Sequence, residues 1–348
     1  TDPSGEDGLD PENRPLGNKQ AGILITDAKN TTIGGATAVD AACSNPNFTE
    51  NRIRGNQGPG VRITGDLAAG NLVRCNSIYD NEGLAIDLGA EGITGNDDKD
   101  EDEGPNHLLN FPVGVTYVTD GTDMLIAGAI DPPSSEQNDP QTVVDLYAMK
   151  FDNTDPMYGV PESARGDGER YLGSVLVPKT GLFGLIVPYA ADYPFVSGVA
   201  TSLVDSSTSE FSTVCRDTDG DANVDTDGDS LCDNWEAEGI DYNGDGNIDL
   251  PLNAAPFNAD PMHQDIFVEI DYMTRGIPPL FGHTHFPSDS MLDDVTRAFQ
   301  DDTTPANSPS IENNDGVNDI KINLMLHKAI SEEPTNKLSN TGPELTKD

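Results

Sequence analysis

Aspartate recurs at every second position from Asp225 to Asp229, a spacing that suits the binding of a hard cation. Calcium takes about six to eight oxygen ligands, so a calcium loop alternates its carboxylates while the backbone curls around the ion. The predicted donors of this first loop, at positions 1, 3, 5, 7, 9 and 12 of twelve, are Asp225, Asp227, Asp229, the Leu231 carbonyl, Asp233 and Glu236. Only the glycine expected at position 6 is missing, because Ser230 stands there.

Two further loops are predicted beside the first. The donors of the second loop are Asp241, Asn243, Asp245, the Asn247 carbonyl and Asp249. Gly246 holds the turn position, but Leu252 stands where a bidentate acid is expected. The donors of the third loop are Asp217, Asp219, Asp221, the Asn223 carbonyl and Asp225, which it shares with the first. We therefore expect about two to three calcium ions in this segment.

The first loop resembles an EF-hand loop, and the overlap at Asp225 resembles thrombospondin type 3 repeats. Segment 217–249 has ten Asp and two Glu without a Lys or Arg, and such a run is also typical of a solvated acidic linker. Alternating ligands and the interspersed Val224, Leu231 and Ile248 favour calcium. Because carboxylates without a cation repel one another, we expect calcium to rigidify a joint between neighbouring domains.

Signals for zinc or acid–base chemistry are weaker. The five histidines include one close pair, His283 and His285, for which a surface turn is a simpler interpretation than a zinc site. Glu269 and Asp271 share one face of a predicted strand, where buried pairing is the simpler interpretation. The sequence contains no H-E-x-x-H, G-x-S-x-G or phosphate-loop motif. We predict no catalytic residue, no organic cofactor and no zinc site within the chain.

Residues 1–110 repeat a theme of Asn, Gly and β-branched residues about every 20 positions, in GILIT, NTTIGG, NRIRGNQGPGVRI and NLVRCNSIYDNEGLAIDL. Short strands joined by left-handed turns predict the coils of a right-handed parallel β-helix. AIDLG, NDDKDEDEGPN and NFPV then follow in an order that resembles the last coils of parallel β-helices in large secreted bacterial and archaeal proteins. The acids of NDDKDEDEGPN are expected to form a solvated loop, with calcium binding as the alternative.

The remaining residues predict three further parts of a mainly β, multi-domain protein. Residues 111–215 hold alternating runs such as VGVTYV and TVVDLYAM, which predict an antiparallel β-sandwich. Residues 216–258 hold the calcium loops. Residues 259–348 read strand, helix, strand, with Ser290 as the helix cap, and predict the start of an α/β domain. There, NADPMHQDIFVEIDYM followed by GHTHFPS resembles the opening of zinc-metallopeptidase-like domains.

Composition narrows the partners and the compartment. The chain has 348 residues and a formal net charge of −42, which disfavours nucleic acid and anionic lipid and also suits a high-salt habitat. No apolar run approaches the roughly 18 residues of a membrane span, so no membrane insertion is expected. Four cysteines without zinc-type spacing predict two disulfides and an extracellular or cell-surface location. Of three pairings, Cys43 with Cys75 and Cys215 with Cys232 keep each bridge inside one predicted domain.

Two functions fit these features. The first is an extracellular calcium-binding structural or surface protein, with adhesion as one form of it, whose partner is an extracellular protein, a glycan or a second copy. The second is the N-terminal portion of a secreted zinc metallopeptidase whose catalytic helix lies beyond residue 348. The first needs no residue that the sequence lacks.

Overall fold

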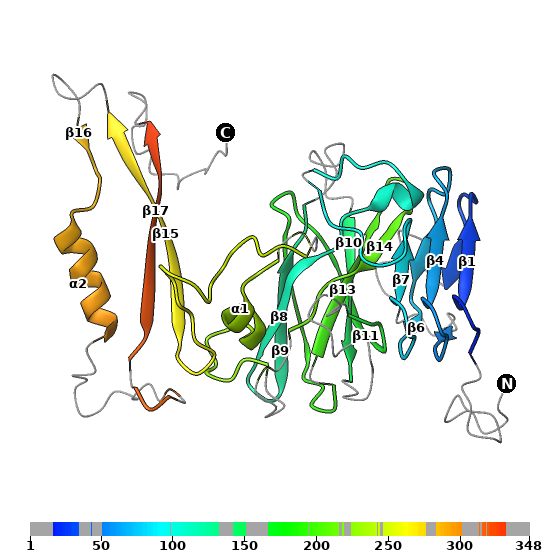
Figure 1. Cartoon of the computed structure of the whole chain (residues 1–348), viewed down its shortest axis with the longest axis horizontal. Helices are drawn as coiled ribbons and strands as arrows, with labels where there is room; N and C mark the ends of the chain where they lie inside the picture. The colour runs from blue at the N-terminus through cyan, green and yellow to red at the C-terminus, as the bar shows by residue number, and fades with distance from the viewer. Residues whose placement is uncertain are drawn as a thin grey trace. The chain divides into compact units, whose positions relative to one another are not determined.

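A computed structural model of the chain (Figure 1) describes residues 17–34, 43, 51–97, 99–131, 142–150, 166–193, 195–215, 218, 224–241, 243, 246–275, 283–300, 313, 315–317 and 319–331. Within this part the fold is mainly β, with several parallel and antiparallel sheets, none of which closes on itself. The chain divides into two compact units. The first comprises Thr1–Asp225 and Ser230–Asn258, and the second comprises Thr226–Asp229 and Ala259–Asp348.

Seven short strands at the start of the first unit form three parallel sheets, in the orders β1-β4-β7, β2-β5 and β3-β6. The strands are β1 Ile23–Thr26, β2 Thr32–Gly34, β3 Arg52–Ile53, β4 Val61–Thr64, β5 Leu72–Arg74, β6 Ser77–Ile78 and β7 Ile86–Leu88. Their apolar side chains alternate inward, as Val61 and Ile63 do at 0% exposure. Successive passes of the chain therefore lie in parallel register over a common core.

Asparagine ladders connect these passes at their corners. Asn56 Nδ2 donates to Asn81 Oδ1 at 2.7 Å, and the Asn18 backbone amide donates to Asn56 Oδ1 at 2.9 Å. These pairs are separated by 25 and 38 residues along the chain. The predicted period of about 20 residues was thus too short, because one pass contains three strands and their turns, and the earlier pass also contains residues 35–50.

Two antiparallel sheets follow, in the orders β11-β10-β13-β14 and β12-β9-β8. The strands are β8 Val113–Thr119, β9 Asp123–Ala129, β10 Thr142–Met149, β11 Arg170–Leu176, β12 Leu182–Pro188, β13 Phe195–Ser202 and β14 Thr208–Phe211, preceded by the turn η1 Pro105–Leu108. Side chains of both sheets, such as Met124 and Ile126 from one and Val144 and Val196 from the other, share one core.

The parallel strands and the four-stranded antiparallel sheet also share a core, in which Tyr147, Val199 and Phe211 pack with residues of β4 and β7. A fully buried ion pair joins the two regions, since Arg74 of β5 donates to both carboxylate oxygens of Asp145 of β10, at 2.6 and 2.7 Å. Removing one partner of such a pair costs on the order of 3 to 5 kcal/mol.

The second unit contains a strand–helix–strand connection. β15 Asp265–Arg275 pairs in parallel with β17 Lys321–Ser331, and β16 His283–Thr284 adds an antiparallel edge. Between them lies α2 Asp289–Gln300, as the sequence predicts. The predicted cap at Ser290 was wrong, because the Met291 amide donates to the hydroxyl of Ser288, two residues earlier. Two apolar residues of this helix, Val295 and Phe299, are exposed at 42% and 38%.

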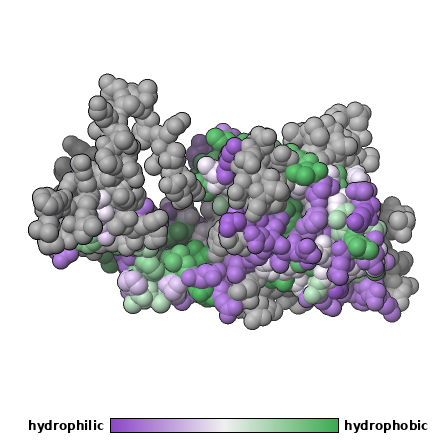
Figure 2. Space-filling model, turned by 90° about the horizontal axis from the view of Figure 1, so that it is seen from above, coloured by the Kyte–Doolittle hydropathy of each residue, from purple (hydrophilic) through white to green (hydrophobic). Residues whose placement is uncertain are grey.

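Both favoured disulfides, Cys43–Cys75 and Cys215–Cys232, are present. Among the described residues, no helix is long and apolar enough to cross a membrane. Figure 2 shows that hydrophilic residues predominate on the described part of the visible face, with smaller apolar patches between them. That surface agrees with the large negative charge of the sequence.

Candidate metal centre

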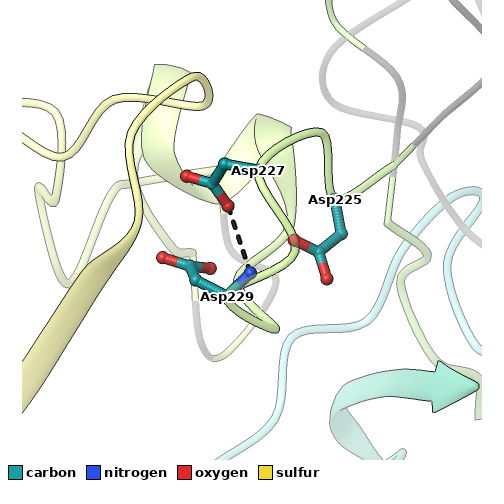
Figure 3. Close-up of side chains that lie close together, drawn as sticks. All are labelled: Asp225, Asp227 and Asp229. Carbon is teal, nitrogen blue, oxygen red and sulfur yellow. Dashed lines mark hydrogen bonds between the residues drawn. The ribbon is translucent and has the colours of Figure 1, made fainter. Parts of the chain in front are cut away.

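Three carboxylates of the first loop meet at one place. A carboxylate oxygen from each of Asp225, Asp227 and Asp229 lies within 4.8 Å of the other two (Figure 3). Oxygens at this spacing fit around a single cation, whose calcium–oxygen distances are about 2.3 to 2.6 Å. In the described part of the chain these three acids form the one cluster with that geometry.

Backbone amides fix the curl of this loop. The Asp229 amide donates to Asp227 Oδ1 at 3.1 Å, and the Ser230 amide donates to Asp225 Oδ2 at 3.2 Å. Ser230 has a φ of 78°, the left-handed conformation that a glycine normally supplies at position 6. The loop therefore makes the expected turn with serine in that position.

The later predicted donors lie on the following turn and on α1 Asp233–Glu238. Asp233 and Glu236 are each 1% exposed, and both belong to the first helical turn. Leu231, which precedes the helix in the sequence, is half-buried. Burying two carboxylates is costly unless a cation or hydrogen-bond donors compensate them, and segment 217–249 contains no Lys or Arg.

A small hydrophobic cluster holds α1 and the loop in place. Val224 and Cys232, at either end of the aspartate turn, are buried with Met149, Phe195, Val214 and Cys215. Trp235 packs against this cluster, and the Cys215–Cys232 disulfide ties position 8 of the loop to the end of the antiparallel sheets. The loop is therefore anchored by covalent and apolar contacts that do not involve its carboxylates.

The first strand of the second unit binds the same turn. The Gln264 side chain donates to the Asp227 carbonyl at 2.8 Å, and the Asp265 amide donates to Asp229 Oδ2 at 2.7 Å. Asp265 is itself 3% exposed and accepts a 2.6 Å hydrogen bond from Asn323 of β17. Sequence reasoning missed Gln264 and Asp265, although an acid at the first position of an apolar strand is a usable signal.

The second loop repeats the turn in a more open setting. The Gly246 amide donates to Asp241 Oδ2 at 2.8 Å, and Gly246 has a φ of 85°. The loop is closed by a β-bridge between Ile240 and Leu250. Asn247 and Asp249 are exposed, Asn243 and Asp241 are half-buried, and Asp245 lies outside the described residues.

The third predicted loop cannot be compared with the structure. Its members Asp217, Asp219, Asp221 and Asn223 lie outside the described residues. Only the shared residue, Asp225, is described, and it belongs to the first-loop cluster.

The donor set of the first loop fits calcium better than a soft metal. Its candidate ligands are carboxylate and carbonyl oxygens, which calcium and magnesium prefer, and Cys232 is held in a disulfide. Magnesium demands near-ideal octahedral geometry and usually keeps several waters, whereas calcium accepts about six to eight oxygens from a flexible protein loop. The residues present therefore fit a calcium ion at Asp225, Asp227 and Asp229.

Other candidate residues are not brought together. Glu269 and Asp271 are exposed on β15, so the expectation that they are buried was wrong. His285 is exposed beside β16, as expected for a surface turn. His263 instead lies between two carboxylates, with Nδ1 2.9 Å from Asp315 and Nε2 3.0 Å from Asp319.

The acids after AIDLG accept hydrogen bonds from backbone amides of their own loop. Asp97 accepts the Glu101 amide at 2.9 Å, and Asp100 accepts the Asn110 amide at 2.7 Å. Partial burial and then the nearby charge of Asp97 raise the pKa of Asp102. These contacts describe a hydrogen-bonded loop, and Asp98 lies outside the described residues.

One buried acid was not singled out from the sequence. Asp87, in AIDLG, has a side chain that is 1% exposed, with Arg62 Nε 3.6 Å away. Burial raises the pKa of Asp87 to about 7, Arg62 opposes the shift, and Glu210 and Glu91 add to it. An aspartate between Ile86 and Leu88 in a short apolar strand is the signal that was available.

A comparison of the sequence with known protein families finds no family that matches.

Proposed function

We propose that this chain is an extracellular calcium-binding structural protein in which calcium rigidifies a joint between domains. The observation that carries the proposal is the meeting of Asp225, Asp227 and Asp229 oxygens within 4.8 Å, in a segment without basic residues. In this proposal the parallel strands are the last coils of a β-helix, the two antiparallel sheets are a β-sandwich, and the loops lie after them.

Electrostatics argues for a cation at the first loop. Two like charges about 5 Å apart repel by about 1 kcal/mol in water and about 3 kcal/mol at the effective dielectric of a protein surface. Three carboxylates contain three such pairs, and Asp233 and Glu236, later in the same loop sequence, are buried. A divalent ion converts this repulsion into attraction, which makes the folded loop depend on calcium.

The position of the cluster in the chain argues for a joint. Thr226–Asp229 belongs to the second compact unit, whereas Asp225 and Ser230–Asn258 belong to the first. Within the second unit, Asp229 binds the start of β15, and Asp265 links β15 to β17 through Asn323. An ion that fixes the turn would therefore also fix the strand that follows it.

Location and partners follow from composition. Two disulfides and the acidic surface support an extracellular or cell-surface setting. We propose an extracellular protein, a glycan or a second copy as the partner, with adhesion as one outcome. The metallopeptidase alternative places its zinc-binding helix beyond residue 348, and none of the contacts of the described residues specifically favours it.

Calcium removal tests the proposal. We expect a calcium chelator to lower the melting temperature and to make residues 217–249 sensitive to limited proteolysis, because the carboxylates then repel one another. Binding at a free calcium concentration about 100 times Kd stabilises a protein by about 2.7 kcal/mol. Unchanged melting and unchanged cleavage in chelator, with calcium restored in a parallel sample, would reject it.

A further inference from the structure

The asparagines of the parallel-strand region fall into two groups. Those of the ladders are buried and use their side-chain amides inside the fold, as Asn56, Asn71 and Asn81 do at 4%, 0% and 1% exposure. Asn30 is instead exposed and begins the sequence Asn30-Thr31-Thr32. The pattern Asn-x-Thr is the acceptor for N-linked glycans in secreted proteins.

The structure presents this acceptor at a turn. Asn30 lies between β1 and β2 with a φ of 55°, and its backbone amide donates to the Ala69 carbonyl at 3.1 Å. The Thr31 amide donates to Asn71 Oδ1 at 3.0 Å. The backbone is thus fixed by the next pass of the chain, while the Asn30 and Thr32 side chains are exposed.

A glycine in the neighbouring pass leaves room for the Asn30 side chain. Gly70 has a similar left-handed φ of 69°, and a Cβ added there would come within 2.7 Å of Asn30 Oδ1. Glycine at that position leaves room for the asparagine side chain above it. No hydrogen bond of the Asn30 side-chain amide occurs within the described part of the chain, in contrast to the ladder asparagines.

We propose that Asn30 carries an N-linked glycan, and this inference rests on the extracellular location in the proposed function. The donor is an oligosaccharide joined through its anomeric carbon to a lipid-linked phosphate. The bond from Asn30 Nδ2 to that carbon forms, the bond from the carbon to the phosphate oxygen breaks, and one Nδ2 proton is lost to the transferase. The exposed Thr32 hydroxyl supplies the second recognition element of the acceptor.

A glycan at this turn would protect an edge of the fold. β1 and β2 are terminal strands of their sheets within the described residues, because each pairs on one side alone, with β4 and β5. Exposed strand edges can pair with other chains, and proteins shield them with bulky or polar groups. The turn between β1 and β2 is a position from which one glycan covers both edges.

The test is glycopeptide mapping of the full chain, secreted by a host that has N-glycosylation machinery. We expect a glycan mass on the peptide containing Asn30, loss of that mass in Asn30→Gln and Thr32→Val, and its retention in the matched control Thr32→Ser. Because Thr32 is exposed, both threonine variants should fold, and circular dichroism checks this.

Further measurements in the same experiment serve as controls. The second acceptor sequence, Asn47-Phe48-Thr49, lies outside the described residues and is mapped separately. An unmodified Asn30 peptide, while a reporter glycoprotein of the same host is modified, would overturn the inference. Calcium titration of the same preparation tests the proposed function independently, so that the two failures can be told apart.

Discussion

The first and second acidic loops make the same turn in different surroundings. In both, the amide at position 6 donates to the carboxylate at position 1, from Ser230 to Asp225 and from Gly246 to Asp241. In the first loop, however, Glu236 is 1% exposed, whereas Asp249 of the second is exposed. Ligand spacing thus predicts the turn, while the demand for a cation depends on burial, which spacing does not encode.

Different anchors produce this difference. The first loop continues into α1 and is tied down by a disulfide and an apolar cluster. The second is closed by the Ile240–Leu250 bridge, and Leu252, at the position of the missing bidentate acid, is a core residue at 2% exposure. We therefore expect the first loop to bind calcium more tightly than the second.

We expect the largest effect on the difference between the two loops from a substitution at Glu236. Glu236→Gln keeps the shape of the side chain but removes a charge from the buried position 12, so calcium affinity of the first loop should fall on the order of 100-fold, about 2.7 kcal/mol. Trp235 is the single tryptophan of the chain and lies in this loop. Its fluorescence during calcium titration therefore reports on the first loop.

The matched variant is Asp249→Asn in the second loop. It should leave the Trp235 titration unchanged, since it alters a loop without tryptophan, and it should lower the total calcium bound in calorimetry. Equal effects of Glu236→Gln and Asp249→Asn on Trp235 would mean that the two loops are not distinct sites.

The sequence predicted much of this centre and missed its context. The alternation of acids was enough to predict Asp225, Asp227 and Asp229 as ligands, because the ligand spacing of a calcium loop is a local property of the sequence. Glycine preference cast doubt on Ser230, but surrounding contacts hold serine in the left-handed conformation. Gln264 lies 37 residues after Asp227, to whose carbonyl it donates a hydrogen bond. No local sequence pattern encodes a contact over that separation.

The fold gives a similar lesson. Recurring Asn, Gly and β-branched residues predicted stacked passes, and parallel pairing such as Ile23 with Val61 is present. A full pass is longer than the predicted recurrence of about 20 positions, because it contains three strands and their turns and spans 25 residues from Asn56 to Asn81. The fully buried Arg74–Asp145 pair joins residues that are 71 positions apart, and neither residue is unusual in its own segment.

Asp87 sharpens the comparison, because burial raises the pKa of this carboxyl to about 7 and so favours its protonated, neutral form at lower pH. Its folded pKa of about 7 lies above the ordinary 3.8, so the folded protein holds a proton that the unfolded chain releases. This contribution to stability is complete below about pH 4 and is lost as pH rises through 7, with a ceiling of about 4 kcal/mol.

Asp87→Asn should therefore be more stable than the parent at pH 8, by about 2 kcal/mol, because the amide resembles the protonated acid. At pH 4 the two proteins should differ little. Urea unfolding of both proteins across this range measures the difference and cancels the contributions of all other acids. A variant that is less stable than the parent at pH 8 would show that the Asp87 charge is favourable beside Arg62.

The smallest expected effect tests whether the two turns are equivalent, by exchanging glycine at position 6. Ser230→Gly should relieve left-handed strain and stabilise the first loop by about 0.5 kcal/mol, after the added flexibility of the unfolded chain is counted. Gly246→Ala should destabilise the second by about 1 kcal/mol. A Cβ at Gly246 meets nothing within 4 Å, so the cost is backbone strain rather than a clash. Melting curves in saturating calcium measure both changes, and a stabilising Gly246→Ala would mean that the second turn does not hold its left-handed geometry in solution.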